Sequence, residues 1–128
     1  MSIVSIGTDI TRIDRLEEAV ERRGERFLDR IFTPGERAYC ERRALRRTTH
    51  YAGRFAVKEA VMKVLGTGWT KGVRWRDIEV VRAPGAAPTV VLHGRCAEHA
   101  RARGIARIHV SITHDAGLAL AFAVGEDT

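Results

Sequence analysis

The sequence is poor in cysteine and has no long hydrophobic run. Its two cysteines, Cys40 and Cys96, lie far apart and form no Cys-x-x-Cys pair, so neither a disulfide framework nor a structural zinc site is expected. No apolar stretch approaches the ~20 residues that a membrane span requires, and the amino terminus lacks the pattern of a signal peptide. We therefore expect a cytoplasmic protein with reduced thiols.

Aromatic residues are also scarce, at 6% of the chain, whereas hydrophobic residues make up 45% of it. The core must then be filled mainly by aliphatic side chains and alanine, and this composition argues against disordered and fibrous classes. At 128 residues the chain should form one compact domain over residues 1–128, because two independent cores would each be very small.

Negative charge is in the minority. The chain has 22 Lys and Arg residues against 16 Asp and Glu residues, which gives a net charge of +6. Such a field attracts nucleic acids, phosphorylated cofactors and acidic protein surfaces alike. A small nucleic-acid-binding module is one hypothesis, because arginines cluster at 42–47. It ranks second, since stacking aromatics are few and no nucleic-acid motif is present.

The chain begins with a predicted strand and a predicted helix. Residues 2–10 combine β-branched side chains with partial alternation, which predicts a strand with Asp9 near its end. Apolar positions at helical spacing predict a basic amphipathic helix over residues 12–23, ended by Gly24. Residues 27–32 are expected to form a short apolar turn.

Two further helices are predicted before the middle of the chain. Thr33 and Glu36 form a capping box around Pro34, so a helix should begin there. A long helix over about 49–65 should end at Gly66, since glycine readily adopts the left-handed conformation at helix ends.

The second half of the chain contains short runs rich in β-branched residues, with one helix among them. We expect strands at 77–82, 88–92, 107–113 and 117–124, and a helix at 94–103. This mixed order predicts an α+β domain with a mainly antiparallel sheet packed against a long central helix.

Two acidic side chains are the main candidates for catalysis. Glu59 shares a helical face with Lys63, four residues later, and Asp9 lies where the chain leaves a strand. In isolation, Glu59 and Lys63 could be an exposed pair worth only ~0.3–0.5 kcal/mol, and Asp9 a helix cap. If they meet, the two carboxylates suffice for Mg²⁺, which completes its shell with water and substrate phosphates. Lys63 would then serve phosphate oxygens, as phosphoryl transfer requires.

His114 is a further candidate, at the end of a predicted strand and on the face of Val110 and Ile112. It is either an anion-binding or proton-transferring group, or an imidazole hydrogen-bonded at a strand end. A serine hydrolase is not indicated, because Ser111 lacks the Gly-x-Ser-x-Gly context.

Specific motifs run in order along nearly the whole chain. The most specific are Gly7-Thr8-Asp9 and Arg54-Phe55-Ala56-Val57-Lys58-Glu59-Ala60, and further matching segments lie at 32–36, 63–68, 77–80 and 110–114. Together they resemble the holo-acyl-carrier-protein synthases, the short type of 4′-phosphopantetheinyl transferase. The resemblance implies that fold and an enzyme that transfers 4′-phosphopantetheine from coenzyme A to a serine of apo acyl carrier protein, releasing adenosine 3′,5′-bisphosphate.

The resemblance also implies roles for individual residues. Asp9, Glu59 and Lys63 would be the catalytic residues. Asp9 and Glu59 would bind Mg²⁺, with Mn²⁺ as an alternative, and Lys63 would contact the coenzyme A phosphates and aid proton transfer. The remaining coenzyme A contacts would come from Arg46, Arg54, Gly66 and His114. Three groups are alternatives for removing the serine proton: Glu59, Asp9 and a water on the metal.

Partners follow from the same resemblance. Arg15 and Arg22 of the first helix would dock the acidic carrier protein, although either could equally belong to a solvated helix face. The resemblance implies a homotrimer with active sites between subunits, and a role in fatty acid biosynthesis in the cytoplasm. Neither a membrane nor a nucleic acid is an expected partner.

Overall fold

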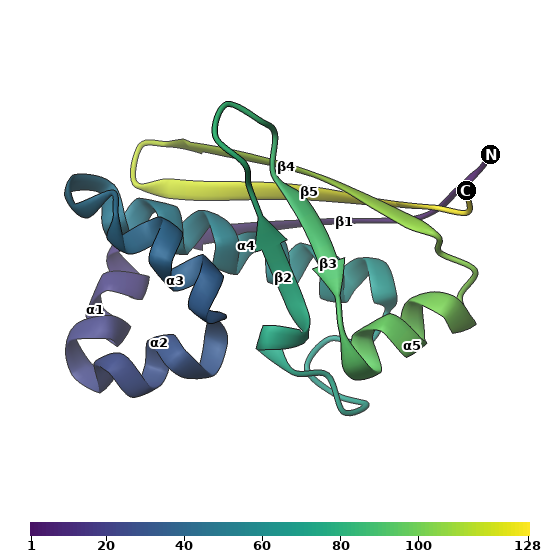
Figure 1. Ribbon diagram of the computed structural model, residues 1–128, viewed down its shortest axis with the longest axis horizontal. Coiled ribbons are helices and arrows are strands. Elements are labelled where there is room, and N and C mark those ends of the chain that lie inside the picture. Colours follow the sequence, from purple (N-terminus) through teal and green to yellow (C-terminus); the bar gives the residue numbers. More distant parts are fainter.

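The computed structural model describes residues 1–128 (Figure 1). The elements in chain order are β1 (Ile3–Arg12), α1 (Ile13–Arg23), α2 (Glu25–Ile31), α3 (Pro34–Glu41), η1 (Ala44–Arg46), α4 (Arg47–Leu65), η2 (Trp75–Asp77), β2 (Ile78–Val81), β3 (Thr89–Leu92), α5 (Gly94–Ala102), β4 (Arg107–Asp115) and β5 (Leu118–Glu126). None of the helices combines the length and the hydropathy needed to cross a membrane.

Two antiparallel sheets confirm the predicted α+β class. The larger sheet has the order β1-β5-β4, and the smaller one pairs β2 with β3. In the larger sheet Asp9 pairs with Ala121, which in turn pairs with Ile112. The alanines of β5 at 119, 121 and 123 are buried, so the inner face of this sheet lets a helix approach closely.

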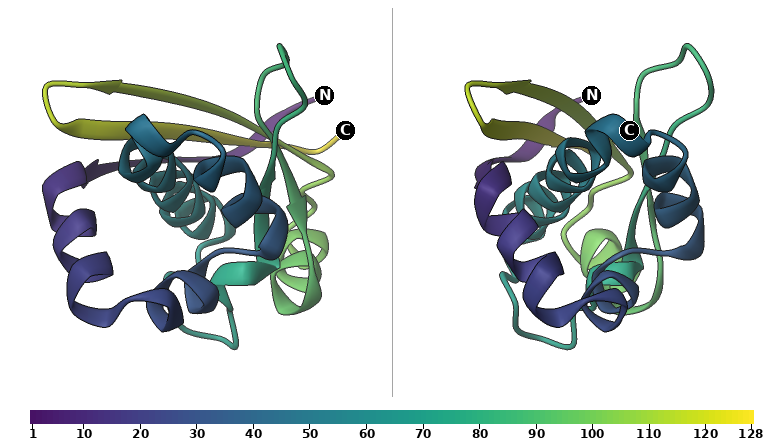
Figure 2. Two further views of the ribbon diagram at one scale, coloured as in Figure 1. Left: turned by 60° about the vertical axis from the view of Figure 1, so that its left-hand side comes forward. Right: turned by 90° about the vertical axis from the view of Figure 1, so that its left-hand side faces the viewer.

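The long helix α4 lies against the inner face of the larger sheet. Figure 2 shows α1 on one side of α4, and α3 with the β2–β3 hairpin on the other. Gly66 ends α4 with a φ of 74°, the left-handed conformation expected at this position. The predicted central helix is thus confirmed, although it begins at Arg47 rather than at residue 49.

Gly7 allows β1 and α4 to touch. A Cβ atom at this position would collide with the carbonyl oxygen of Ala60 and would lie 3.0 Å from the Cβ of Lys63. The absence of a side chain at Gly7 therefore sets the distance between the strand that carries Asp9 and the helix that carries Glu59.

The prediction of a short turn at 27–32 was wrong, because most of this segment forms α2. Gly24 separates it from α1 with a φ of 67°. Leu28 and Ile31 are both buried, and their spacing of three residues puts them on one helical face against the core. A segment this short is not a stable helix by itself, so the packing of this face against the core stabilises α2.

A buried ion pair joins α3, α4 and the β2 region. Lys58 is fully buried and donates hydrogen bonds to Glu36 Oε1 at 2.9 Å and to the carbonyl oxygens of Trp75 and Ile78. The other oxygen of Glu36 accepts from the backbone N–H of Val80 at 2.8 Å. Burial lowers the pKa of Lys58, and the nearby Glu36 carboxylate opposes this effect.

Candidate active site

Asp9 and Lys63 meet at the contact between β1 and α4. Lys63 Nζ donates to the carbonyl oxygen of Thr8 at 2.8 Å and lies 3.5 Å from Asp9 Oδ1. The hydroxyl of Thr11 donates to the other oxygen of Asp9 at 3.3 Å. These contacts orient the carboxylate while both of its oxygens keep further acceptor capacity.

Glu59 lies one turn before Lys63 on α4 and is half-buried. Burial raises the pKa of its carboxyl group; the negative charge of Asp9 raises it further, and Lys63 lowers it. Asp9 and Glu59 line one cavity of about 480 Å³, which α1 completes with Arg15 and Leu16. The sequence alone did not show that these carboxylates meet.

The donor set of this cavity fits Mg²⁺. It offers carboxylate oxygens from two side chains, Asp9 and Glu59, and the chain contains no group of three or more His, Cys, Asp or Glu side chains that could hold a metal ion without further ligands. Mg²⁺ takes one or two protein carboxylates and keeps its other positions for water and substrate phosphates. A carboxylate such as Glu59, whose negative charge is disfavoured by burial and by the charge of Asp9, is suited to a divalent cation.

His114 lies in a second cavity, of about 460 Å³. Its other charged and aromatic lining residues are Tyr39, Arg43, His50 and Arg82. The pKa of His50 is lowered to about 4, first by burial and then by the positive charges of Arg54, Arg43, His114 and Arg46. Arg43 and Arg82 line this cavity and no carboxylate does, so it is cationic and suited to phosphate groups.

The remaining predicted coenzyme A contacts occupy different environments. Arg46 is exposed in η1. Arg54 is only 2% exposed, and its guanidinium stacks 4.0 Å from the centre of the Tyr39 ring, so it supports the cavity wall from behind. Gly66 lies beside the guanidinium of Arg103, which donates to the carbonyl oxygen of Val64 at 3.1 Å.

The two cavities share no lining residue. One lies along β1 and α1, the other along β4 and α3, and β5 lies between β1 and β4. Within a single chain, the structure thus brings Asp9, Glu59 and Lys63 together and leaves His114 in a separate half-site. The sequence analysis did not assign Arg43, His50 and Arg82 to this site: Arg43 was noted only as part of the arginine cluster at 42–47, and His50 and Arg82 belong to no motif.

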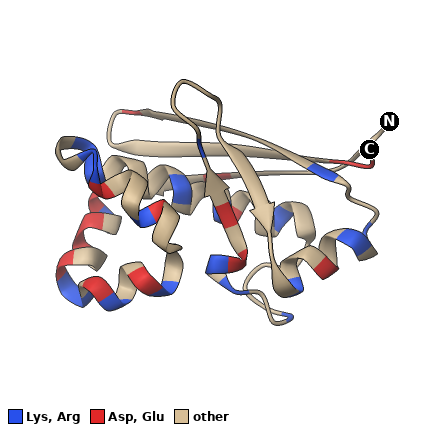
Figure 3. Cartoon of the chain, viewed as in Figure 1, with Lys and Arg blue, Asp and Glu red and all other residues tan.

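The predicted docking residues lie on α1. Arg15 lines the cavity of Asp9 and Glu59, and Arg22 is exposed in the last turn of the helix. A neighbouring hollow is lined by Phe27 and three arginines, at positions 23, 26 and 30. Figure 3 shows that acidic residues alternate with these basic ones along α1 and α2, so the positive charge is local.

Residues 5–123 match the model of the 4′-phosphopantetheinyl transferase superfamily. The chain belongs to this superfamily. A relative named holo-acyl-carrier-protein synthase, from Solibacter usitatus, is 47% identical over 125 residues, which cover 98% of this chain and 99% of the relative. The resemblance found in the motifs is thereby confirmed.

Solved structures of phosphopantetheinyl transferases have the same fold. The holo-acyl-carrier-protein synthase of Neisseria meningitidis superposes with a TM-score of 0.87 at 31% identity, covering 98% of this chain and 99% of that one. The enzyme of Helicobacter pylori, solved in complex with coenzyme A, gives 0.82 at 36% identity and covers 94% and 99%.

Proposed function

We infer that this chain is a holo-acyl-carrier-protein synthase. It transfers the 4′-phosphopantetheine group of coenzyme A to a serine of apo acyl carrier protein and releases adenosine 3′,5′-bisphosphate. The observation that carries this conclusion is 47% identity to such a synthase over nearly the full length of both chains. The conclusion is supported by the cavity that Asp9 and Glu59 line and by Lys63, whose Nζ lies 3.5 Å from Asp9 Oδ1.

We propose the following role for the site residues. The serine oxygen bonds to the β-phosphorus while its proton passes to Glu59, Asp9 or a water beside them. The bond from that phosphorus to the oxygen bridging it to the α-phosphorus breaks, and this oxygen leaves as part of adenosine 3′,5′-bisphosphate. Lys63, with its exposed ammonium beside Asp9, holds phosphate oxygens, and Asp9 and Glu59 hold Mg²⁺. The bound ion supplies charge neutralisation to the pyrophosphate.

The cationic cavity of His114 is our candidate for the nucleotide end of coenzyme A. Arg43 and Arg82 line it, so either guanidinium can hold the 3′-phosphate by paired hydrogen bonds. Arg46 remains a further proposed contact from η1. Arg54 supports the cavity indirectly: its buried guanidinium stacks on the ring of Tyr39, and Tyr39 lines the cavity.

We propose a homotrimer with active sites between subunits. The outer face of the larger sheet carries uncovered apolar side chains, among them Ile6, Ile10 and Phe122, which are 69%, 58% and 53% exposed. A contiguous apolar patch of this kind is typical of an interface. The two half-sites also lie on separate sides of α4, so a second subunit would supply the half that each one lacks.

The proposed partners include the acidic carrier protein, docked by Arg15 and Arg22. Arg15 supports this role best, because it lies on the rim of the cavity in which the carrier serine must react. By family resemblance we further propose a cytoplasmic location and a role in fatty acid biosynthesis.

One assay tests the function. The chain is incubated with coenzyme A, Mg²⁺ and an apo acyl carrier protein, and the carrier is weighed by intact mass spectrometry. We expect a mass gain equal to one phosphopantetheine, which EDTA abolishes and added Mg²⁺ restores. No gain on any of several apo carriers would refute the proposed function, and a gain that resists EDTA would refute the metal site alone.

A further inference from the structure

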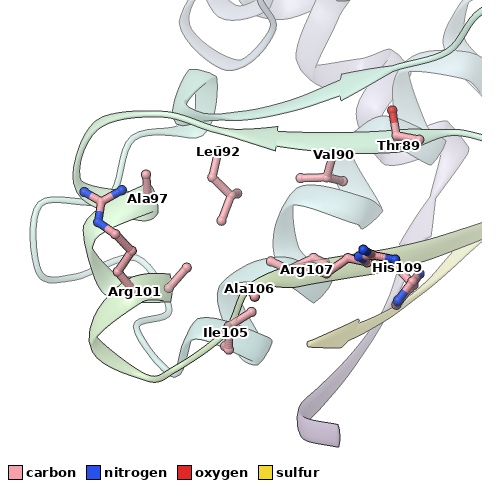
Figure 4. Close-up of a pocket in the computed structure, with 11 residues that line it drawn as sticks. Thr89, Val90, Leu92, Ala97, Arg101, Ile105, Ala106, Arg107 and His109 are labelled. Atoms are coloured by element: carbon pink, nitrogen blue, oxygen red, sulfur yellow. The ribbon is translucent and has the colours of Figure 1, made fainter. Parts of the chain in front are cut away.

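A third cavity, of about 460 Å³, lies apart from both halves of the active site (Figure 4). It opens between β3, α5 and the beginning of β4. All of its lining residues fall within one continuous stretch of chain, residues 89–109. Asp9 of β1 lies level with Ile112 of β4, because both pair with Ala121 of β5. Arg107, which lines the third cavity, is five residues from Ile112 along β4, so roughly 17 Å of extended strand separates this cavity from the level of Asp9.

The walls of this cavity are aliphatic. Val90 and Leu92 of β3 lie opposite Ile105, and Ala97 of α5 lies at one end of the cavity (Figure 4). Ile108 of β4 also lines it. Ile105 is buried, and Val90, Leu92 and Ile108 are half-buried. The volume falls within the range of roughly 300–1,000 Å³ that is usual for small-molecule sites.

Positive charge flanks these walls. Arg101 lies at the α5 end of the cavity and Arg107 at the other end, and both are exposed (Figure 4). Neither guanidinium takes part in a salt bridge or a side-chain hydrogen bond. Of the nearby carboxylates, Glu98 pairs with Arg95 outside the cavity. Glu126, the cross-strand neighbour of Arg107, lies 3.2 Å from Nε2 of the lining residue His109 and makes no ion pair with Arg107.

We propose that this cavity binds a small organic anion with an aliphatic body, for which a medium-chain carboxylate is the simplest example. The alkyl chain packs between the walls of β3 and β4, and the carboxylate accepts hydrogen bonds from Arg101 or Arg107. A compact ligand fits better than an extended peptide, because the whole lining comes from the short segment 89–109 and the volume is only about 460 Å³.

Decanoate is the probe for this site. Titrated into the ¹⁵N-labelled full-length chain below its micelle concentration, it should shift backbone amide resonances of residues 89–109 in a saturable way. Decyltrimethylammonium has a chain of the same length with the opposite charge. Its affinity should be lower by about tenfold or more, because an ammonium head group cannot accept the charge-assisted hydrogen bonds from Arg101 or Arg107.

Charge variants locate the head group. The double variant Arg101→Gln/Arg107→Gln should weaken decanoate binding by about tenfold, whereas Arg95→Gln, on the same helix but outside the cavity, should change it by less than about twofold. Ala106→Trp fills the cavity from an exposed position and should abolish binding while the fold, monitored by circular dichroism, is retained.

Three results would overturn the proposal. The first is equal binding of the carboxylate and the ammonium compound. The second is a set of shifts centred on Ile6, Ile10 and Phe122, the apolar face of the larger sheet. The third is undiminished decanoate binding by a folded Ala106→Trp variant. None of these outcomes depends on whether the chain transfers phosphopantetheine, so this proposal and the proposed function can fail separately.

Discussion

At the scale of single residues, the most informative pair is Asp9 and Glu59. Asp9 contacts the side chains of Thr11 and Lys63. Glu59 is half-buried. Asp9 makes an ion pair only with Lys63, and Glu59 makes none, so the fold leaves carboxylate oxygens free for the proposed metal site.

We expect Asp9→Ala and Glu59→Ala each to lower the transfer rate by about 100-fold or more, because each removes a charge that the transition state requires. The rate is measured by the mass of the carrier at saturating Mg²⁺. Glu98→Ala, an exposed change on α5, is the matched control and should leave the rate unchanged. Full activity of the Asp9→Ala/Glu59→Ala double variant would reject the metal site.

The buried Lys58 is a second decisive residue. Lys58→Met leaves the Glu36 carboxylate buried without its partner, so the free energy of unfolding should fall by about 3–5 kcal/mol. Urea denaturation measures this loss. Arg95→Met breaks an exposed pair with Glu98 and should cost at most about 1 kcal/mol. Equal losses in the free energy of unfolding would show that the buried pair contributes no more to stability than the exposed one.

At the scale of elements, the contact of β1 with α4 builds the catalytic half-site. Gly7→Ala places a methyl group against the Ala60 carbonyl, so β1 must move away from α4. We expect a stability loss of about 1–3 kcal/mol together with a slower transfer rate. Gly35→Ala is the control, because its new Cβ would meet only an ordinary contact, at 3.6 Å from Glu79. A Gly7→Ala enzyme with unchanged rate and melting temperature would contradict this account.

The helix α1 supplies the proposed docking surface. Arg15→Glu should raise the KM for the carrier by about tenfold and leave the KM for coenzyme A nearly unchanged, since a rim charge mainly affects the encounter with a charged partner. The effect should shrink at high ionic strength. Arg95→Glu gives the same change of net charge on a distant helix and should have little effect. Equal losses toward both substrates would indicate damage to the fold instead.

At the scale of the whole molecule, the proposed trimer has a specific consequence. Glu59→Ala and His114→Ala subunits, each inactive alone, should regain part of the activity when they are unfolded and refolded together. Mixed trimers would contain sites with an intact Glu59 from one subunit and an intact His114 from the next. Glu59→Ala mixed with Asp9→Ala should stay inactive, because both residues belong to the same half-site. No recovery in the first mixture would argue against sites between subunits.

The sequence by itself determined the class of fold, most of the elements and the family. Capping residues such as Thr33 and Gly66 act locally, and hydrophobic periodicity follows from the geometry of a helix or a strand. The prediction of a turn at residues 27–32 was wrong, because α2 is stabilised there by packing against the core and not by a local sequence signal.

Only the tertiary structure decided which side chains meet. Asp9 and Lys63 are 54 positions apart, and their approach depends on the absence of a side chain at Gly7. The same packing buries Arg54 behind Tyr39 and gathers Arg43, His50 and Arg82 around His114. Local pattern cannot specify such contacts, because they arise from how the strands and α4 pack together and not from the order of residues within any one of them.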